Sequence, residues 1–370
     1  MSTANIITCA SAHPTGLASV ALPSVFTLEI TTACDNFCSG CANVELSRNK
    51  ACRSTSNVYM ARWREIIDQV GSMSSGQGII RLSGGEPTLH PDFERIVQHL
   101  GQLGLSFTVQ STGRWGKVGV SKVIKILQAQ PCFLGLLISL HGSNATDHCG
   151  FTESPAKAFV DTCYNIKATT QEGLRVFTNT VITNKNFDKI SDIVSLSQQL
   201  GAEMAVFNRF VATEHALMPT PQQLSIALQT ILGLRQQGNA CRIGNSIPKC
   251  FFPHNAYAAP AGFELCHISP SGKVRPDNFS NFGFGNLFFN DLSNIWNSDK
   301  AHFFRNHIPN SCLDCAALPA CRGGVKSLSV ESGIAQGDPL MIAPLSFEQV
   351  QGWNDDKDKT DRVMLALTSD

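Results

Sequence analysis

The chain has 370 residues, more than one domain usually holds, so it can bury a large core and form a second, smaller unit. Hydrophobic residues make up 43% and charged residues 16% of it, which excludes a disordered protein. Its 29 basic residues balance 29 acidic ones, so no overall field favours nucleic acid or an anionic membrane as a partner.

The 14 cysteines are more than a chain of this length usually contains. The first residues lack the basic and apolar pattern of a secretory signal, and no apolar run reaches the roughly 18 residues needed to span a membrane. We therefore expect a cytoplasmic protein with reduced thiols, in which clustered cysteines more often bind metal than form disulfides.

Short β-rich segments alternate with amphipathic ones after residue 24, as in βα units around a parallel sheet. The expected strands are 26–30, 79–83, 106–111, 135–140, 176–182 and 204–210. The expected helices lie near 60–70, 92–100, 118–127, 156–168 and 187–199, followed by 222–234. Six strands cannot close an eight-stranded barrel, so the pattern predicts an open, partial (β/α)6 barrel.

The composition changes after Cys241: Gly, Pro, Asn and Phe become frequent and helical periodicity fades. Such texture with repeated cysteines is typical of a small domain held together by metal. We therefore divide the chain into an N-terminal extension (1–24), a barrel (25–215), a bridging helix and linker (216–245), a cysteine-rich domain (246–330) and a charged, partly disordered tail (331–370).

Cys34, Cys38 and Cys41 follow the first strand as CDNFCSGC, so one loop can wrap three thiolates around a small inorganic body. Iron–sulfur clusters take thiolate ligands, and a cubane bound by only three of them keeps one iron open. An open iron can chelate S-adenosylmethionine (SAM) and pass it an electron, which yields a radical able to remove hydrogen from an unactivated carbon. A structural zinc is the alternative, although no histidine lies in this loop.

The GGEP segment after the second strand, Gly84, Gly85, Glu86 and Pro87, completes a pattern with the cysteine triad. Together they resemble the radical SAM enzymes, in which glycines let backbone carbonyls approach the methionine ammonium. The resemblance implies that polar residues ending the later strands contact the ribose and methionine of SAM, namely Ser139, His141, Asn179, Thr180, Asn208 and Arg209. A loop histidine satisfied by the backbone is the alternative for His141.

The sequence departs from the family pattern at two points. Gly40 precedes the third cysteine, where the family commonly has an aromatic residue, so we expect Phe37 or the pair Ala42 and Asn43 to pack on the adenine. The segment HGSNATDHCGF directly after the fourth strand contains no arginine, although some relatives have one there, and Arg175 and Arg209 are the candidates for binding the methionine carboxylate.

The run CLDCAALPACRGG and the upstream CHISPSGKVRPD resemble the SPASM auxiliary-cluster domain or its shortened form, called twitch. Asp277 and Val325 stand where a full domain has cysteines. We expect one auxiliary [4Fe-4S] cluster held by Cys312, Cys315 and Cys321 plus Cys266 or Cys250; a second cluster would need another ligand, for which Asp277 is the candidate. Structural zinc at these thiolates is the alternative.

The other cysteines have no ligand spacing and are expected to be small buried hydrophobic residues: Cys9, Cys52, Cys132, Cys149, Cys163 and Cys241. Cys149 and Cys52 fall in expected loops on the side of the active site. They are therefore candidates for donating a hydrogen atom to a substrate radical.

The resemblance runs from Val25 to Val325 and implies an enzyme that modifies a ribosomally made peptide by crosslinking, epimerisation or backbone excision. It also implies an electron donor such as flavodoxin or ferredoxin. Only 24 residues precede the first strand, so we expect a separate leader-binding partner protein or direct binding of the peptide by the barrel. The alternatives are a radical SAM enzyme acting on a small-molecule precursor, such as a tetrapyrrole or sugar, and a non-catalytic metal-binding scaffold.

Overall fold

The computed structural model describes residues 22–41, 43, 60–116, 118–212, 215–254, 259–331 and 337–350. Six parallel strands come first, and they confirm the predicted positions: β1 (Val25–Thr31), β2 (Ile79–Gly84), β3 (Phe107–Ser111), β4 (Phe133–Ser139), β5 (Val176–Ile182) and β6 (Met204–Arg209). The helices between and after them are α1 (Met60–Met73), α2 (Phe93–Gln102), α3 (Val120–Gln128), α4 (Ala145–Thr152), α5 (Lys157–Gln171), α6 (Ile190–Gln199) and α7 (Pro221–Gln236), with a 3-10 turn, η2, at Pro87–Leu89.

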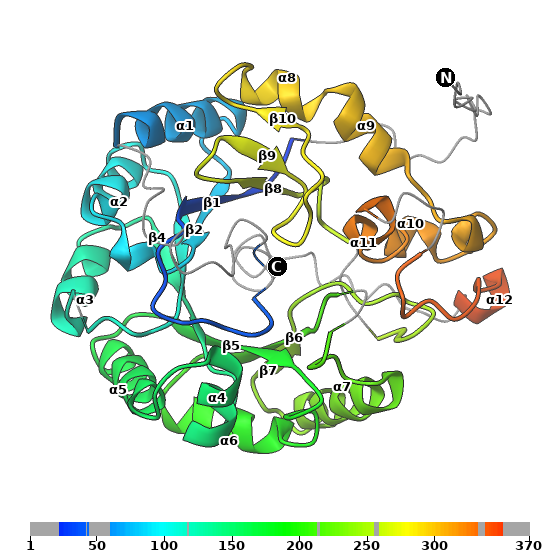
Figure 1. Ribbon diagram of the computed structural model, residues 1–370, viewed down its shortest axis with the longest axis horizontal. Coiled ribbons are helices and arrows are strands. Elements are labelled where there is room, and N and C mark those ends of the chain that lie inside the picture. Colours follow the sequence, from blue (N-terminus) through cyan, green and yellow to red (C-terminus); the bar gives the residue numbers. More distant parts are fainter. Residues whose placement is uncertain are drawn as a thin grey trace, which may run out of the picture.

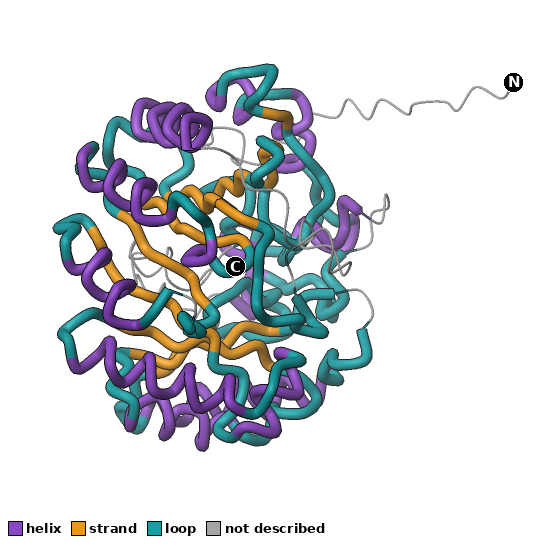
Figure 2. Tube along the Cα trace, turned by 60° about the vertical axis from the view of Figure 1, so that its left-hand side comes forward, coloured by secondary structure: helices purple, strands orange, loops and turns teal. Residues whose placement is uncertain are grey.

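The sheet curves around the centre of the molecule, and helices α1 to α3 and α5 to α7 pack on its outside (Figures 1 and 2). Phe26, Leu28 and Ile30 of β1 point outward into a core shared with Trp63 and Ile67 of α1. The alternate residues of the strands face the inside of the barrel, because successive side chains of a strand point to opposite faces. Val25, Ile79 and Leu265 pack together there and form an apolar floor.

The sheet has more strands than the six predicted. β7 (Cys241–Ile243) pairs parallel with β6, while β8 (Leu265–Ile268) pairs parallel with β1. β9 (Lys273–Arg275) and β10 (Gly285–Asn286) then continue from β8 in antiparallel fashion. The cysteine-rich region thus shares the sheet with the barrel, because β8 satisfies the open main-chain edge of β1.

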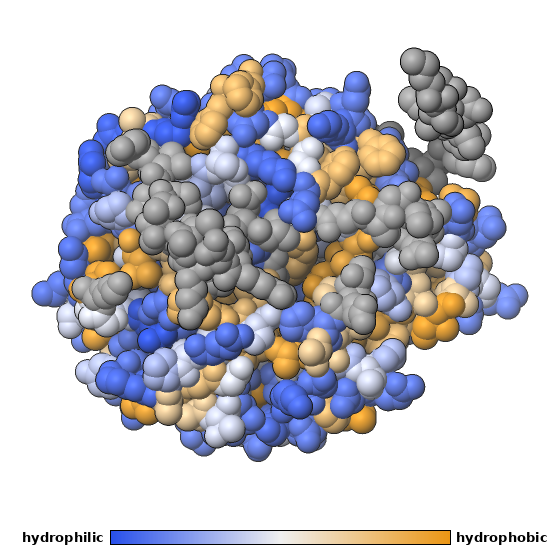
Figure 3. All heavy atoms as spheres, viewed as in Figure 1, coloured by the Kyte–Doolittle hydropathy of each residue, from blue (hydrophilic) through white to orange (hydrophobic). Residues whose placement is uncertain are grey.

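The rest of the cysteine-rich region consists of short helices and turns. They are α8 (Leu292–Trp296), α9 (Asp299–Asn306), η3 (Asn310–Cys312), α10 (Leu318–Cys321), α11 (Lys326–Glu331) and α12 (Phe347–Val350). Helices α10, α11 and α12 lie at the open side of the barrel, between α7 and α9 (Figure 1). On the face seen in Figure 3, the outer ring of helices presents mostly hydrophilic residues. Across the described residues, no helix combines the length and apolar character that a membrane crossing requires.

Helix α4 was not predicted, and it corrects the placement of Cys149, which lies in this helix and not in a loop. Asn144 caps the helix by accepting a hydrogen bond from the backbone N–H of Asp147 at 3.0 Å. The helix is short and lacks an apolar stripe, so periodicity could not reveal it. The thiol of Cys149 donates to the carbonyl of Pro155 at 3.3 Å, while Cys52 lies outside the described residues.

Cys266 belongs to the outer core of the sheet. It is fully buried in β8, lies in register with Phe26, and packs in the same hydrophobic cluster as Trp296 and Phe304. Burial raises the pKa of its thiol far above the ordinary value. The strand alternation therefore directs Cys266 toward the helices.

Candidate functional site

The cysteine triad lies on the loop of residues 32–41, which directly follows β1 and is named the cluster loop here. It runs across the mouth of the barrel, at the ends of the parallel strands (Figure 1). Ligands bind at this edge in parallel α/β sheets, because loops from neighbouring strands converge there. Four other segments hold the cluster loop in place.

The GGEP segment after β2 lies directly against the start of the cluster loop. The N–H groups of Gly85 and Glu86 donate to the carbonyls of Thr31 and Ala33, each at 2.7 Å. A Cβ atom added at Gly85 would lie 2.1 Å from the carbonyl oxygen of Ala33. These glycines are therefore required by the close approach of two backbone segments, a reason that the sequence did not reveal.

Glu86 is fully buried and ties the ends of β2 and β3 together. Its carboxylate accepts hydrogen bonds from the hydroxyl of Ser111 at 2.9 Å, from the backbone N–H of Thr112 at 2.6 Å and from the hydroxyl of Thr88 at 2.7 Å. Burial raises its pKa, and these donors oppose the rise. Glu86 thus acts as a structural link beneath the cluster loop.

Arg114, which sequence analysis did not single out, holds the cluster loop from the side of β3. Its guanidinium donates to the carbonyl of Asp35 at 2.8 Å and to the side chain of Asn36 at 2.7 Å. It also lies 3.7 Å from the carboxylate of Asp35. The polar run STGR at the end of the third strand was the signal that could have pointed to Arg114. The loops that follow parallel strands converge at one edge of the sheet, so this run lies near the loop that follows the first strand.

Helix α4 holds the cluster loop through its last carbonyls. The N–H of Phe37 donates to Thr152 at 2.9 Å, and the N–H of Ser39 donates to Phe151 at 3.1 Å. The hydroxyl of Ser39 also donates to the carboxylate of Glu153 at 2.5 Å. The helix thereby uses carbonyls that have no partner within it to fix the loop.

Phe210, at the end of β6, fills the space beside Gly40. A Cβ atom added at Gly40 would lie 2.5 Å from the ring of Phe210 and 3.2 Å from that of Phe151. His215 packs on Phe210 with ring centroids 4.8 Å apart, and its Nε2 hydrogen-bonds the carbonyl of Ser39 at 3.0 Å. Glycine at position 40 thus makes room for an aromatic ring supplied by another strand.

Three of the predicted polar residues share the inner face of neighbouring strands. Ser139 lies in register with Asn179, and the amide of Asn208 donates to the side-chain oxygen of Asn179 at 2.7 Å. Below them, Leu137, Phe177 and Val206 form an apolar floor. This row can therefore contact a polar ligand that enters from the mouth of the barrel.

The side chains of His141 and Thr180 form hydrogen bonds with backbone groups. Nδ1 of His141 accepts the N–H of Val181 at 3.2 Å, and the hydroxyl of Thr180 donates to the carbonyl of Leu140 at 2.5 Å. Burial, and secondarily His148, lowers the pKa of His141 well below its usual range. His141 is therefore neutral near pH 7.

The two arginines proposed for the methionine carboxylate already have carboxylate partners. Arg209 is buried and forms a bidentate ion pair with Asp338, with one hydrogen bond of 2.9 Å. Arg175 precedes β5, at the opposite end of the barrel, where it pairs with exposed Glu203 at 2.6 Å. The structure gives Arg175 no access to the mouth of the barrel and uses Arg209 elsewhere, so both assignments require correction.

Four cysteines line a cavity of about 120 Å³ at the open side of the barrel: Cys250, Cys312, Cys315 and Cys321. Of the two alternatives for the fourth thiol, the structure thus places Cys250 there and Cys266 in the core. Burial, and then the neighbouring cysteines, raises the pKa of Cys312 to about 11. A cationic group in the cavity would relieve this repulsion between thiolates.

The four thiols match the ligand number of one fully ligated cluster. Iron–sulfur clusters take thiolate ligands, and a cubane takes four of them. A structural zinc also takes four thiolates, so the cavity by itself is compatible with both kinds of metal centre.

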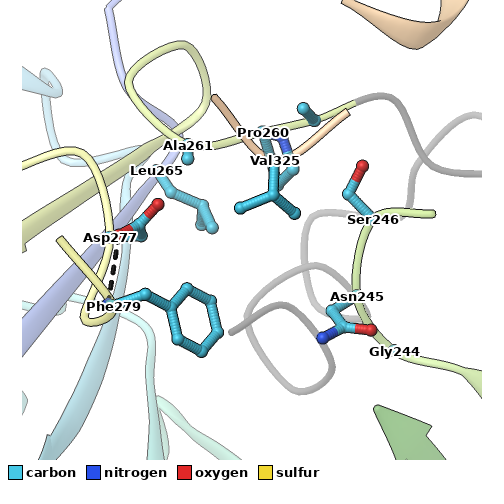
Figure 4. A pocket seen from close by; sticks show the side chains of 10 residues that line it. Gly244, Asn245, Ser246, Pro260, Ala261, Leu265, Asp277, Phe279 and Val325 are labelled. Atoms are coloured by element: carbon cyan, nitrogen blue, oxygen red, sulfur yellow. Dashed lines mark hydrogen bonds between the residues drawn. The ribbon is translucent and has the colours of Figure 1, made fainter. Parts of the chain in front are cut away.

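Asp277 and Val325 lie together in a different cavity, of only about 20 Å³, whose lining includes Asn245 and Phe279 but no cysteine (Figure 4). The carboxylate of Asp277 accepts the N–H groups of Phe279 at 3.1 Å and Ser280 at 3.0 Å. It also accepts the hydroxyl of Ser327. The structure thus gives Asp277 a role in closing a turn and does not bring it to the thiols.

Two family models match the chain over these two sites. The radical SAM superfamily model matches residues 28–196, and the model of SPASM, an iron–sulfur cluster-binding domain, matches residues 260–316. The chain is a radical SAM protein with a SPASM domain. Its cofactors are accordingly a [4Fe-4S] cluster and SAM, and the SPASM domain implies auxiliary iron–sulfur chemistry.

Relatives of this radical SAM protein align over most of their length. It is 26% identical to a PqqA peptide cyclase of Xanthomonas campestris pv. campestris (strain 8004), with 88% of each chain covered. It is 23% identical to an AdoMet-dependent heme synthase of Methanosarcina barkeri (strain Fusaro / DSM 804), with 81% of this chain and 90% of the relative covered.

Solved structures share the fold of this radical SAM protein. Streptococcus suis SuiB bound to precursor peptide SuiA superposes with a TM-score of 0.71 at 16% identity, covering 86% of this chain and 76% of that one. Native anSMEcpe with bound AdoMet superposes with a TM-score of 0.63 at 14% identity, covering 81% of this chain and 88% of that one. These likenesses establish the architecture of the barrel and its C-terminal extension.

Gly85→Ala should displace the cluster loop, because its new methyl group would collide with the carbonyl of Ala33. We expect this variant to lose SAM binding by at least about tenfold, as when a 1 Å misplacement disturbs a site. Equilibrium binding of SAM to the anaerobic holoprotein measures the effect. Gly116→Ala, whose added methyl meets no atom within 4 Å, is the control and should bind SAM normally. Equal affinities in both variants would contradict the close-approach argument.

The buried histidines should make the protein sensitive to acid. Burial, and then Arg114, lowers the pKa of His148 from 6.5 to about 4. Between these two pH values His148 is protonated in the unfolded chain and neutral in the folded chain. For each such histidine, the free energy of unfolding should therefore fall as the pH drops below about 6.5, by up to about 1.4 kcal/mol per pH unit. Anaerobic urea unfolding at pH 7.5 and 5.5 measures the slope.

His148→Gln should reduce this pH dependence, since it removes one of the two titrating histidines and leaves His141 in place. His302→Gln, at an exposed position, is the matched control. A slope that is the same in the wild type and in both variants would contradict the assignment.

Cys250→Ala should remove the auxiliary cluster and lower the iron content from about eight to about four per chain. Cys266→Ala should keep about eight irons and lose about 1 kcal/mol of stability, because Cys266 fills the core. Iron analysis after anaerobic reconstitution measures both variants. Loss of iron from Cys266→Ala alone would contradict the geometric choice, and about twelve irons in the wild type would indicate a second auxiliary cluster.

Proposed function

We propose that this protein is a radical SAM maturase that abstracts hydrogen from a ribosomally made peptide and thereby modifies it. The observation that carries the proposal is the alignment with PqqA peptide cyclases, which extends through both the barrel and the cysteine-rich region. The architecture shared with SuiB bound to precursor peptide SuiA supports it. The modification would be a crosslink, an epimerisation or a backbone excision.

In this proposal Cys34, Cys38 and Cys41 hold the radical-generating cluster, and Gly84 to Pro87 with the row of Ser139, Asn179 and Asn208 bind SAM. Burial, and then the charges of Glu86 and Asp35, raises the pKa of the Cys34 thiol to about 12, so cationic iron would have to stabilise its thiolate form. When bound, the cluster and SAM supply a radical that removes hydrogen from carbon.

The protein's own residues orient these groups. Arg114, helix α4 and the GGEP segment fix the cluster loop, and neutral His141 gives the backbone of Val181 an acceptor at the edge of the site. Phe210, in place of Phe37 or the pair Ala42 and Asn43, is the aromatic ring that we assign to the adenine. Ala42 lies outside the described residues.

The auxiliary cluster would be bound by Cys250, Cys312, Cys315 and Cys321, and it would accept an electron or bind the peptide. Flavodoxin or ferredoxin would supply electrons to the first cluster, and a separate protein or the barrel itself would bind the leader of the precursor. Clusters that need thiolates and low-potential electrons are maintained in a reducing compartment, so we place the enzyme in the cytoplasm.

Turnover with a peptide tests the proposal. The anaerobically reconstituted holoenzyme, SAM and a reductant are incubated with each short peptide encoded beside its gene. We expect at least one peptide to accelerate formation of 5′-deoxyadenosine and to change in mass. The Cys41→Ala variant is the control, because it removes a proposed cluster ligand. Absence of stimulation by every encoded peptide would refute the peptide assignment.

A tetrapyrrole substrate is the second candidate, because one relative is an AdoMet-dependent heme synthase. A parallel incubation with tetrapyrroles distinguishes the two. Stimulation by a tetrapyrrole and by no peptide would favour this second candidate.

A further inference from the structure

The segment Gly337–Leu345, named the C-terminal strap here, closes one side of the four-cysteine cavity. Met341 and the three residues after it line the cavity together with the four cysteines. The strap lies beyond residue 316, where the SPASM match ends, and within the region that we expected to be a loose tail. Its contacts with the cavity are specific.

Two strap residues touch the sulfur atoms directly. The N–H of Leu345 donates to Sγ of Cys315 at 3.4 Å, and the thiol of Cys312 contacts the thioether sulfur of Met341 at 3.6 Å. The carbonyl of Leu345 also accepts the N–H of Ala316 at 2.9 Å. Hydrogen bonds to ligand sulfurs and exclusion of solvent are the means by which a protein tunes an iron–sulfur cluster.

Asp338 fixes the strap to the rest of the molecule. Its buried carboxylate forms the bidentate pair with Arg209 at the end of β6. It also accepts the N–H of Val325 at 3.0 Å and that of Leu340 at 3.1 Å. A buried carboxylate with this many donors has one favourable position, so it sets where the strap begins.

The ion pair between Asp338 and Arg209 lies next to both proposed sites. Arg209 follows Asn208, whose side chain belongs to the polar row inside the barrel. Val325 lies four residues after Cys321, one of the cavity thiols. The ion pair therefore joins the end of a barrel strand to the wall of the auxiliary cavity.

We propose that the C-terminal strap is a structural part of the auxiliary metal centre, in which Met341 shields the thiolates, the Leu345 N–H orients Cys315, and Asp338 positions the strap through Arg209. The proposal rests on the proposed binding of an iron–sulfur cluster by the four cysteines. Met341 is a cover in this arrangement, because the cavity already offers a cubane four thiolates. Asp338 is a positioning residue, since it acts through the strap.

The experiment isolates the auxiliary cluster. A parent variant with Cys34, Cys38 and Cys41 all changed to Ala is reconstituted anaerobically so that only the auxiliary site holds iron. Asp338→Asn, Met341→Ala and Met341→Leu are then made in this parent. Glu203→Gln is the matched control, because it breaks a bidentate ion pair with Arg175 far from the cavity. The rate of iron transfer to a chelator and the midpoint potential of the cluster are measured.

We expect Asp338→Asn and Met341→Ala to release iron about tenfold faster than the parent and to shift the potential, as loss of supporting contacts around metal ligands does. Met341→Leu and Glu203→Gln should behave as the parent does, because leucine keeps the apolar cover. Met341 is only half-buried, so Met341→Ala should still fold. If Asp338→Asn does not fold, Met341→Ala alone tests the role of the strap.

Three results would overturn the proposal. Unchanged iron release and potential in Met341→Ala would show that the strap does not protect the cluster. Equal effects of Met341→Leu and Met341→Ala would mean that the thioether is itself a ligand. A parent without auxiliary iron would reject the strap's role together with the assignment of the thiolates. None of these measurements uses a peptide, so they stand apart from the test of the substrate.

Discussion

The pairing of β1 with two parallel neighbours is the constraint on which both sites depend. β2 lies on one side of β1 and β8 on the other, so one strand belongs at once to the barrel and to the cysteine-rich region. The buried ion pair between Glu29 of β1 and Arg275 of β9 reinforces this connection. Because the cluster loop continues directly from β1, its position is fixed relative to the antiparallel pair of β8 and β9 as well as to the barrel.

The cluster loop has little structure of its own, and its shape is imposed by its neighbours. Backbone groups of the GGEP segment, the guanidinium of Arg114, the last carbonyls of α4 and the ring of His215 all contact it. Each of these contacts is a hydrogen bond that fixes part of the loop backbone or of its side chains. A rigid loop suits a site that must hold a cluster and a cofactor in one orientation.

The cysteine-rich region contains two cavities: one is lined by four cysteines, and the other is small and has no cysteine in its lining. Four thiols and the C-terminal strap enclose the first cavity. In the second, Asp277 and Val325 occupy the two positions at which the resemblance to SPASM domains implied cysteines, and the carboxylate of Asp277 accepts hydrogen bonds from Phe279, Ser280 and Ser327. At that place polar and apolar packing holds the region together.

The sequence alone determined the six barrel strands, all but one of the helices between them, the cysteine triad and the GGEP segment, because these depend on local periodicity and short spacing. It could not reveal α4, which has no apolar stripe, nor that β8 would extend the sheet from β1. Tertiary structure also placed Cys250 in the four-cysteine cavity and Cys266 in the core, since the position of Cys266 depends on which face of β8 its side chain occupies. It assigned Arg209 to Asp338, 129 residues away along the chain, because such a pair forms only when distant segments fold together.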